Sequence, residues 1–213
     1  MSRIIIFANG YLPDLEKARA LIRADDTLIA ADGGTRHALA LGLKPDLIVG
    51  DLDSITEDER QKMESDGVKI AKHSRDKNET DLELAIQYAL ELKPEQIIIV
   101  AALGGRLDQT LANLALISDE RLTQLDVRLD DGVEEAFFCR DQVRVQGGSG
   151  DVVSLIPWQG AVAVVRTENL KWPLHNEMLY PEKSRGVSNE MTSDIASIEI
   201  KSGLLLVVHY RNS

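Results

Sequence analysis

The chain has 213 residues and a formal net charge of −11, with 44% hydrophobic and 28% charged residues. This charge disfavours a nucleic-acid partner, because binding a phosphate backbone needs a basic face. No run approaches the roughly 18 apolar residues of a membrane span, so we expect no membrane association.

The first 125 residues alternate short apolar runs with amphipathic ones, which predicts a mostly parallel sheet with helices on both faces, a Rossmann-like α/β domain. The expected strands are Ile4–Ala8, Leu28–Ala31, Leu47–Val49, Val68–Ala71 and Ile97–Leu103. The expected helices are Leu15–Ala24, Thr35–Leu41, Glu57–Ser65, Asp81–Leu92 and Leu107–Ile117. Capping-box spacing marks two of the helix starts, at Thr56 with Glu59 and at Thr80 with Glu83.

Residues 126–213 have a different pattern, of short alternating segments separated by turns, which predicts a small C-terminal antiparallel β-sandwich. The expected strands are Ala136–Arg140, Val143–Val145, Val152–Ile156, Ala161–Arg166, Ile195–Ile200 and Leu204–Tyr210. The expected turns are 147–150, Gln159-Gly160 and Ser202-Gly203.

The start of the chain and its cysteine content indicate the compartment. The apolar run Ile4–Phe7 is too short before Asn9-Gly10 to be the core of a signal peptide. The single cysteine, Cys139, has apolar neighbours and reads as a buried thiol in a reducing compartment. We therefore expect a cytoplasmic protein. The four histidines have no zinc-like spacing and are expected in surface or packing roles.

Five loops follow the predicted parallel strands and carry glycines, acids and two cations. In a parallel sheet the strands end at the same edge, where ligands bind. The loops hold Asn9-Gly10, Asp32-Gly33-Gly34, Asp51-Leu52-Asp53, the segment 76–81 and the segment 104–109.

A metal–nucleotide site explains this combination. Glycines and helix N-termini suit phosphate, and Lys77 and Arg106 can hold its oxygens. The carboxylates would repel phosphate unless Mg²⁺ bridged them. Each piece alone has a simpler explanation: Asp32 or Thr80 as a helix cap, Asp51 and Asp53 as turn residues, and Arg106 with Asp108 as a surface ion pair.

Four motifs, taken in order, resemble the thiamine pyrophosphokinase family: A-D-G-G at 31–34, G-D-L-D-S at 50–54, T-D-L-E-L-A at 80–85 and G-G-R-L-D-Q at 104–109. The likeness continues into 169–174 and 187–190, which resemble the family's thiamine-binding β domain. It implies an enzyme that transfers a diphosphoryl group from ATP to the hydroxyl of thiamine. It also implies an ATP-binding domain at 1–125, a thiamine-binding domain at 126–213, and a homodimer with active sites at the subunit interface.

The resemblance also implies roles for single residues. Asp51, Asp53 and Asp81 would hold Mg²⁺, and Asp32 would lie beside the ATP phosphates. Arg106 and Asp108 would lie at the transfer site, with Asp108 as one candidate for the base. The remaining expected binding residues for nucleotide or thiamine are Asn9, Gly33, Lys77, Thr80, Gly105, Gln109, Trp172, Ser188 and Asn189.

Several points stay open in the sequence. Asn78 stands where family members often have an acid, and Gly186 where they often have a serine. Trp172 fits either an aromatic wall for thiamine or the core of the sandwich. Ser188 and Asn189 fit either ligand contacts or a turn.

Two other functions also remain. The pair Asp51 and Asp53 forms a D-x-D that could serve a metal-dependent nucleotide-sugar transferase, although this leaves 104–109 unexplained. A nonenzymatic nucleotide sensor is the second alternative.

Overall fold

The computed structural model describes residues 2–53 and 56–212, apart from the side chain of Glu59. Ser54 of the G-D-L-D-S motif and the Glu59 half of the predicted capping box therefore lie outside the described residues. The chain divides into two compact units, Met1–Gly132 and Val133–Ser213. Within the described ranges, no helix combines the length and the apolar character needed to cross a membrane.

The first unit is a six-stranded parallel sheet with helices on both faces, as predicted. The strand order is β6-β5-β1-β2-β3-β4, and every pairing is parallel. Its strands are β1 (Arg3–Phe7), β2 (Thr27–Ala31), β3 (Leu47–Gly50), β4 (Lys69–Lys72), β5 (Gln96–Val100) and β6 (Asp126–Asp130). Its helices are α1 (Leu15–Ala20), α2 (Thr35–Ala40), α3 (Glu57–Ser65), α4 (Asp81–Glu91) and α5 (Leu107–Ile117), with short 3₁₀ turns at Asp32–Gly34 and Glu120–Leu122.

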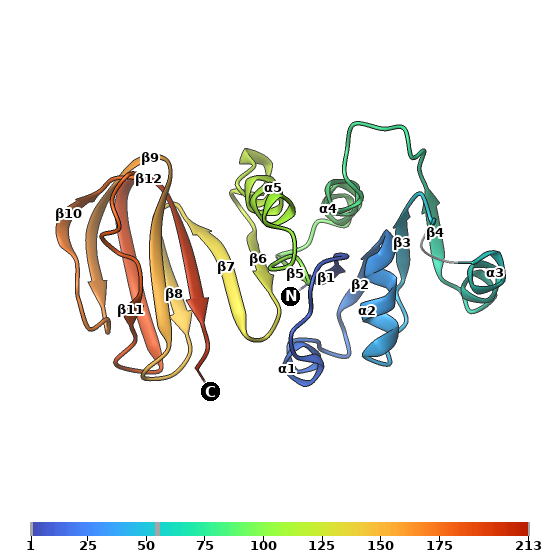
Figure 1. Ribbon diagram of the computed structural model, residues 1–213, viewed down its shortest axis with the longest axis horizontal. Coiled ribbons are helices and arrows are strands. Elements are labelled where there is room, and N and C mark those ends of the chain that lie inside the picture. Colours follow the sequence, from blue (N-terminus) through green and yellow to red (C-terminus); the bar gives the residue numbers. More distant parts are fainter. Residues whose placement is uncertain (1, 54–55, 213) are drawn as a thin grey trace. The chain divides into compact units, whose positions relative to one another are not determined.

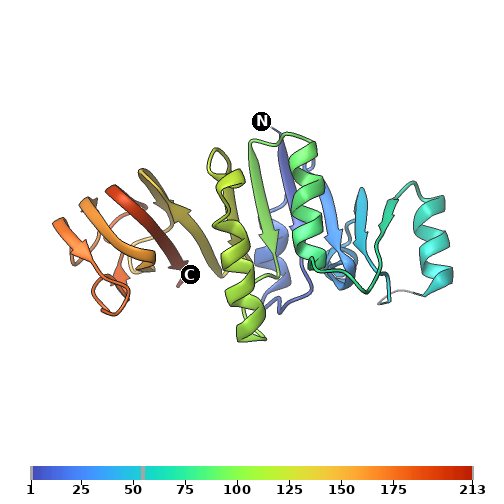
Figure 2. The ribbon, with the colours of Figure 1, turned by 90° about the horizontal axis from the view of Figure 1, so that it is seen from above.

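The central strands are buried on both faces, which explains why they read as unbroken apolar runs rather than alternating ones. All five residues of β1 are buried, and β1 lies between β2 and β5. Helices α4 and α5 cover one face of the sheet, while α1 and α2 cover the other (Figures 1 and 2). The order of the strands reverses at β1, where parallel sheets of this kind open a crevice.

Three elements of the first unit differ clearly from the prediction, and one of them is β5, which ends at Val100 rather than at Leu103. Helix α1 ends at Ala20 rather than Ala24. The Asp26 carboxylate accepts hydrogen bonds from the Arg23 N–H and from the Arg3 side chain, and these bonds hold the chain in a turn before β2. Strand β6 was not predicted, because only Val127 and Leu129 are apolar within it.

The second unit is an antiparallel structure of two layers, as predicted. The strands are β7 (Glu134–Cys139), β8 (Gln142–Gln146), β9 (Val152–Glu168), β10 (His175–Leu179), β11 (Asn189–Glu190) and β12 (Ile195–Tyr210). Each of its two longest strands, β9 and β12, runs through both layers. The first half of β9 pairs with the second half of β12, beside β7 and β11. The other halves pair with each other beside β8 and β10.

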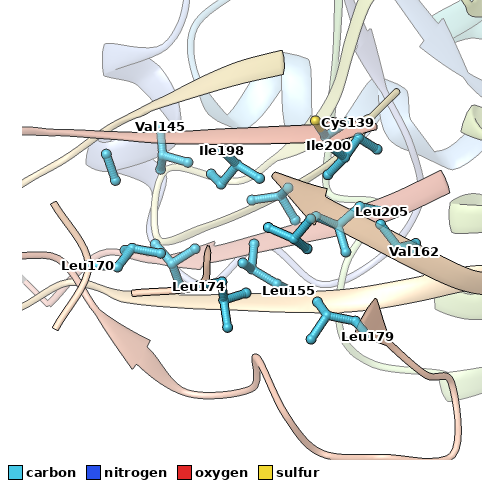
Figure 3. Packing of buried hydrophobic residues seen from close by; sticks show 14 of the residues in the cluster. Cys139, Val145, Leu155, Val162, Leu170, Leu174, Leu179, Ile198, Ile200 and Leu205 are labelled. Atoms are coloured by element: carbon cyan, nitrogen blue, oxygen red, sulfur yellow. The ribbon is translucent and has the colours of Figure 1, made fainter. Parts of the chain in front are cut away.

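Buried side chains from both layers form one core, which includes Leu155, Val162, Leu174, Ile198 and Leu205 (Figure 3). The predicted burial of Cys139 is confirmed, and burial raises the pKa of its thiol to about 11. The predicted turns at Gln159-Gly160 and Ser202-Gly203 are wrong, because both lie inside long strands. Positive φ angles at these sites and register shifts between β9 and β12 mark where the strands bend.

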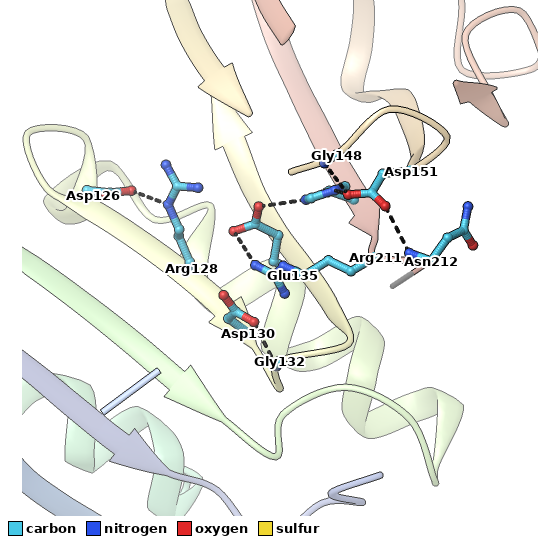
Figure 4. A network of polar contacts seen from close by, with 10 residues as sticks. Asp126, Arg128, Asp130, Gly132, Glu135, Gly148, Asp151, Arg211 and Asn212 are labelled. Atoms are coloured by element: carbon cyan, nitrogen blue, oxygen red, sulfur yellow. Dashed lines mark hydrogen bonds and ion pairs between the residues drawn. The ribbon is translucent and has the colours of Figure 1, made fainter. Parts of the chain in front are cut away.

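His209 is buried in the second unit, which agrees with the packing role predicted for it, and it also joins a polar network that was not predicted. Its Nδ1 lies 3.0 Å from Glu135 Oε1, and its Nε2 lies 3.0 Å from Asp151 Oδ2. The two oxygens of Asp151 also accept the backbone N–H groups of Gly148 and Asn212 (Figure 4). The network therefore ties the end of β12 to the start of β9.

Candidate active site

A cavity of about 630 Å³ lies at the edge where the parallel strands end. All five loops predicted to meet there contribute to it, so the convergence expected from the sequence is observed. Its lining includes predicted residues from each loop and others that were not predicted: Asn9, Tyr11, Asp32, Asp51, Arg75, Lys77, Thr80, Asp81, Gly105, Arg106, Gln109 and Asn113.

Three carboxylates gather around the end of β3. Asp32, Asp51 and Asp53 each offer an oxygen within 4.8 Å of the other two. Gly50 makes this approach possible: a Cβ at this position would lie 2.8 Å from Cβ of Asp32 and 3.2 Å from Oδ1 of Asp81. A side chain at position 50 would therefore displace the acids on both sides of it.

This group differs from the predicted metal set by one residue, since Asp32 joins Asp51 and Asp53 while Asp81 has a cationic partner. Hard oxygen donors at this spacing fit Mg²⁺, which commonly binds through a few carboxylates together with water and substrate phosphate. Asp51 Oδ1 also accepts the Asp53 N–H at 3.2 Å, which orders the short segment between the two acids. Leu52, between them, has a left-handed φ of 65°.

Lys77 and Asp81 form an ion pair at the start of α4. Lys77 Nζ lies 2.5 Å from Asp81 Oδ1. Thr80 is the N-cap residue, and its hydroxyl accepts the Glu83 N–H at 3.1 Å, so the predicted cap is confirmed. The cap fixes the first turn of α4, whose N-terminus faces the cavity through Thr80, Asp81 and Leu82.

Arg106 and Asp108 also form an ion pair, at the start of α5. Arg106 Nε lies 3.1 Å from Asp108 Oδ1, and a second contact joins the guanidinium to the other carboxylate oxygen. Hydrogen bonding by Arg106 holds the pKa of Asp108 below its ordinary value. Both side chains are exposed. The ion pair considered in the sequence is thus present, and Arg106 also lines the cavity.

Asn9 rests on Gly33 and is oriented by a residue that sequence reasoning missed. Arg36 Nη2 donates to Asn9 Oδ1 at 2.9 Å, while a Cβ at Gly33 would lie 2.5 Å from the Asn9 side chain. His37 Nε2 lies 2.9 Å from the Gly10 carbonyl oxygen. The first turn of α2 therefore holds the loop after β1, and no hydrogen bond from the Asn9 amide nitrogen is seen among the described residues.

Tyr11 and Arg75 were also missed. Tyr11 is 60% exposed and packs beside Gly104 and Gly105. Arg75 Nη2 lies 3.7 Å from Asp53 Oδ2. Arg75 could have been found from its place one residue before the segment 76–81. Tyr11 offered no comparable signal, because a tyrosine after a strand is more often a packing residue.

The remaining predicted residues, Trp172, Ser188 and Asn189, lie in the second unit. The Trp172 side chain is half exposed, so of the two alternatives left open for it, the one that placed it in the sandwich core is wrong. Ser188 is exposed, has a φ of 57°, and donates its N–H to Ser154 Oγ. Asn189 is buried, with hydrogen bonds to the backbone of Trp172 and to the N–H of Glu190.

Comparison with known proteins supports the family resemblance of the sequence motifs over both parts of the chain. Residues 18–129 match the model "Thiamin pyrophosphokinase, catalytic domain", and residues 141–205 match "Thiamin pyrophosphokinase, vitamin B1 binding domain". A thiamine pyrophosphokinase of Bacillus subtilis is 29% identical over 182 residues, which cover 84% of this chain and 85% of the relative. Thiamine pyrophosphokinase 2 of Arabidopsis thaliana is 29% identical over 80% of this chain and 67% of its own length.

Solved structures extend the comparison to the fold. The crystal structure of the Bacillus subtilis thiamine pyrophosphokinase aligns with a TM-score of 0.87 and 26% identity over 100% of both chains. A thiamin pyrophosphokinase family protein from Enterococcus faecalis aligns with a TM-score of 0.82 and 25% identity, also over 100% of both chains. With its catalytic-domain match covering more than half of its length, the chain belongs to the thiamine pyrophosphokinase family.

Proposed function

We propose that this protein is an enzyme that transfers the diphosphoryl group of ATP to the hydroxyl of thiamine, giving thiamine diphosphate and AMP. One observation carries the proposal: five loops, four of them within the match to the thiamine pyrophosphokinase catalytic domain, bring carboxylates, amides and cations to one cavity. That combination suits a metal-bound polyphosphate. No observation of comparable weight supports the nucleotide-sugar transferase or the nucleotide sensor.

In this reaction the alcohol oxygen of thiamine attacks the β-phosphorus of ATP. The bond from that phosphorus to the oxygen bridging the α-phosphate breaks, and AMP leaves with the electron pair. Asp32, Asp51 and Asp53 would hold Mg²⁺, which when bound neutralises phosphate charge. Lys77 and Arg106 would bind phosphate oxygens and stabilise the charge that grows in the transition state. Asn9, through its amide nitrogen, and the N-termini of α4 and α5 would add neutral donors.

The proton of the thiamine alcohol must pass to a base. Asp108 is a weak candidate, because Arg106 keeps its pKa low and a good base titrates near the working pH. A dissociative transition state needs little help from a base, so positioning and charge neutralisation do most of the catalysis.

We also propose, from the family resemblance, a cytoplasmic homodimer with active sites at the subunit interface. Cys139 is buried, as suits a protein that needs no disulfide. In a shared site, mixing Asp51→Asn, which is expected to be inactive, with Trp172→Ala, which is expected to bind thiamine more weakly, would give more activity at low thiamine than either variant alone, once the subunits exchange. Mixtures that gain no activity after proven exchange would contradict a shared site.

The direct test incubates the purified protein with ATP, Mg²⁺ and thiamine, and follows AMP and thiamine diphosphate by chromatography. We expect both products in equal amounts, with their formation lost in Asp51→Asn and Asp53→Asn. AMP without thiamine diphosphate would overturn the acceptor. ATP binding without either product would favour the sensor, whereas turnover of an ADP-sugar or UDP-sugar without AMP would favour the sugar transferase.

A further inference from the structure

The lining of the cavity has a charged part and a nearly neutral part. Among the described lining residues, the charged ones other than Arg106 all follow β2, β3 or β4 in the chain: Asp32, Asp51, Arg75, Lys77, Glu79 and Asp81. The lining residues that follow β1 and β5 are, apart from Arg106, alanines, glycines, amides and one tyrosine. Because the strands lie in the order β5-β1-β2-β3-β4, the two parts are neighbours along the edge of the sheet.

A nucleoside triphosphate is divided in the same way. Its polyphosphate carries the negative charge and the metal, whereas its base and sugar are uncharged. The polyphosphate with Mg²⁺ fits the charged part, where the cluster of Asp32, Asp51 and Asp53 and the side chain of Lys77 lie. The base is then left for the neutral part, over the loops after β1 and β5.

Tyr11 supplies an aromatic ring to the neutral part. The ring is 60% exposed and belongs to the cavity lining. The preceding residue is fixed, because Gly10 donates its N–H to the carbonyl oxygen of Ala101 at 2.8 Å. A Cβ at Gly104 would lie 3.7 Å from Cδ1 of Tyr11, so the ring packs beside backbone that carries no side chain. Single exposed aromatic residues are common, but this one lies where a base is expected.

Asn113 supplies a hydrogen-bond acceptor to the same part. This half-buried residue lines the cavity, and its Nδ2 donates to the carbonyl oxygen of Ala102 at 2.9 Å. That bond fixes which end of the amide is the oxygen. Nothing among the described residues donates to Asn113 Oδ1, and no buried side-chain oxygen in that part of the chain lacks a partner. The oxygen is therefore accessible and can accept a hydrogen bond from a ligand.

We propose that Tyr11 and Asn113 bind the adenine base of ATP, with the base stacked on the Tyr11 ring and its 6-amino group donating to Asn113 Oδ1. The inference rests on the proposed function, because ATP is its ligand, and it adds the two residues that recognise the base. Bases stack readily on aromatic side chains. The adenine amino group is a donor, whereas the 6-oxo group of hypoxanthine is an acceptor and would face Oδ1 unpaired.

Calorimetry with AMP and with the magnesium complex of inorganic tripolyphosphate tests the stacking. We expect Tyr11→Ala to raise the Kd for AMP about tenfold, as for one lost base–aromatic stack. The Kd for tripolyphosphate, which has no base, should change less than about twofold, and Tyr11→Phe, which keeps the ring, should bind AMP within about twofold of wild type. Equal weakening of both ligands, or unchanged binding of AMP, would overturn the inference. So would weaker binding of thiamine alone, which would assign the ring to the acceptor.

The hydrogen bond is tested by comparing AMP with IMP, whose base is hypoxanthine. The wild type should bind AMP about tenfold more tightly than IMP, and Asn113→Ala should reduce this preference to about twofold. The two affinities are compared within one protein, so a loss of folded material in the variant cancels. An equal preference in both proteins would overturn the role of Asn113. A wild type that shows the expected preference but forms no thiamine diphosphate would contradict the proposed function and leave the base site supported.

Discussion

Lys77 Nζ lies 2.5 Å from Asp81 Oδ1, and the ammonium group is the more buried partner, with 14% of its side chain exposed against 31% for Asp81. Both residues line the cavity. Lys77 therefore supplies a positive charge inside a largely acidic site and can hold phosphate oxygens without moving far. We expect Lys77→Met to raise the KM for ATP about tenfold or more, because it removes a charge-assisted contact and leaves Asp81 unpaired.

Steady-state kinetics with each substrate varied in turn would check this expectation. The KM for thiamine should stay within about twofold of wild type, a change worth less than one hydrogen bond. Lys77→Arg is the matched variant: it keeps the charge and should recover part of the loss. An unchanged KM for ATP in Lys77→Met would mean that the ion pair serves only to fix the start of α4.

The convergence of the five loops could be predicted because it depends on one rule of parallel sheets. Apolar runs such as Ile4–Phe7 and Ile97–Val100 marked the central strands, and the residues after each had to share an edge. The cap at Thr80 was equally local, since its partner lies three residues along the same helix. Such features are decided by neighbours in the sequence.

Other features depend on contacts between distant residues. Asp32 joins Asp51 and Asp53 only because β2 and β3 are paired and Gly50 leaves room. The contact between Arg36 and Asn9 spans 27 residues. Glycines at 160 and 203 read as turns, but tertiary pairing of β9 with β12 made them bends within strands. Strand β10, which was not among the predicted strands, and the polar partners of His209 were missed for the same reason.

The cluster of Asp32, Asp51 and Asp53 leads to a prediction about the Mg²⁺ concentration that the enzyme needs. Chelation with EDTA should abolish activity, and Asp32→Asn should raise the Mg²⁺ concentration for half-maximal activity about tenfold, through loss of one anionic ligand. Binding of Mn²⁺ followed by electron paramagnetic resonance gives the same comparison without turnover. Asp108→Asn is the control in the same region, because Asp108 pairs with Arg106. Equal metal requirements in the two variants would count against a role for Asp32.

The buried network at His209 predicts how stability depends on pH. Burial alone would lower the pKa of His209, but hydrogen bonds to Glu135 and Asp151 raise it overall above its ordinary 6.5. Burial would raise the pKa of Asp151, yet hydrogen bonds from Asn212, Gly148 and His209 lower it below 3.8. The histidine contribution is complete below pH 6.5 and is lost as the pH rises through the raised pKa. The aspartate contribution is present above pH 3.8 and is lost at lower pH.

Urea unfolding between pH 5 and 9 would check the predicted loss of stability at high pH. The free energy of unfolding should decline above about pH 6.5 in the wild type, and this decline should be largely absent in His209→Gln. At pH 6 the substitution should cost about 3 kcal/mol, since it removes one member of a buried ion network. A variant that keeps the same slope above pH 6.5 would show that other groups cause the decline.

The close packing around Gly34 leads to a prediction about the stability of the protein. A Cβ at this position would lie 1.9 Å from the Phe7 carbonyl oxygen, in backbone that cannot move without disturbing β1. We expect Gly34→Ala to lower the free energy of unfolding by roughly 2 kcal/mol or more, because overpacking a rigid site forces the backbone apart. Gly148→Ala is the control, since nothing lies within 4 Å of its Cβ position. Its effect should stay within about 0.5 kcal/mol, as for most surface substitutions.

Thermal and urea unfolding of both variants would measure the difference. If the two glycines tolerate alanine equally, then the loop after β2 must be able to shift away from β1 at little cost.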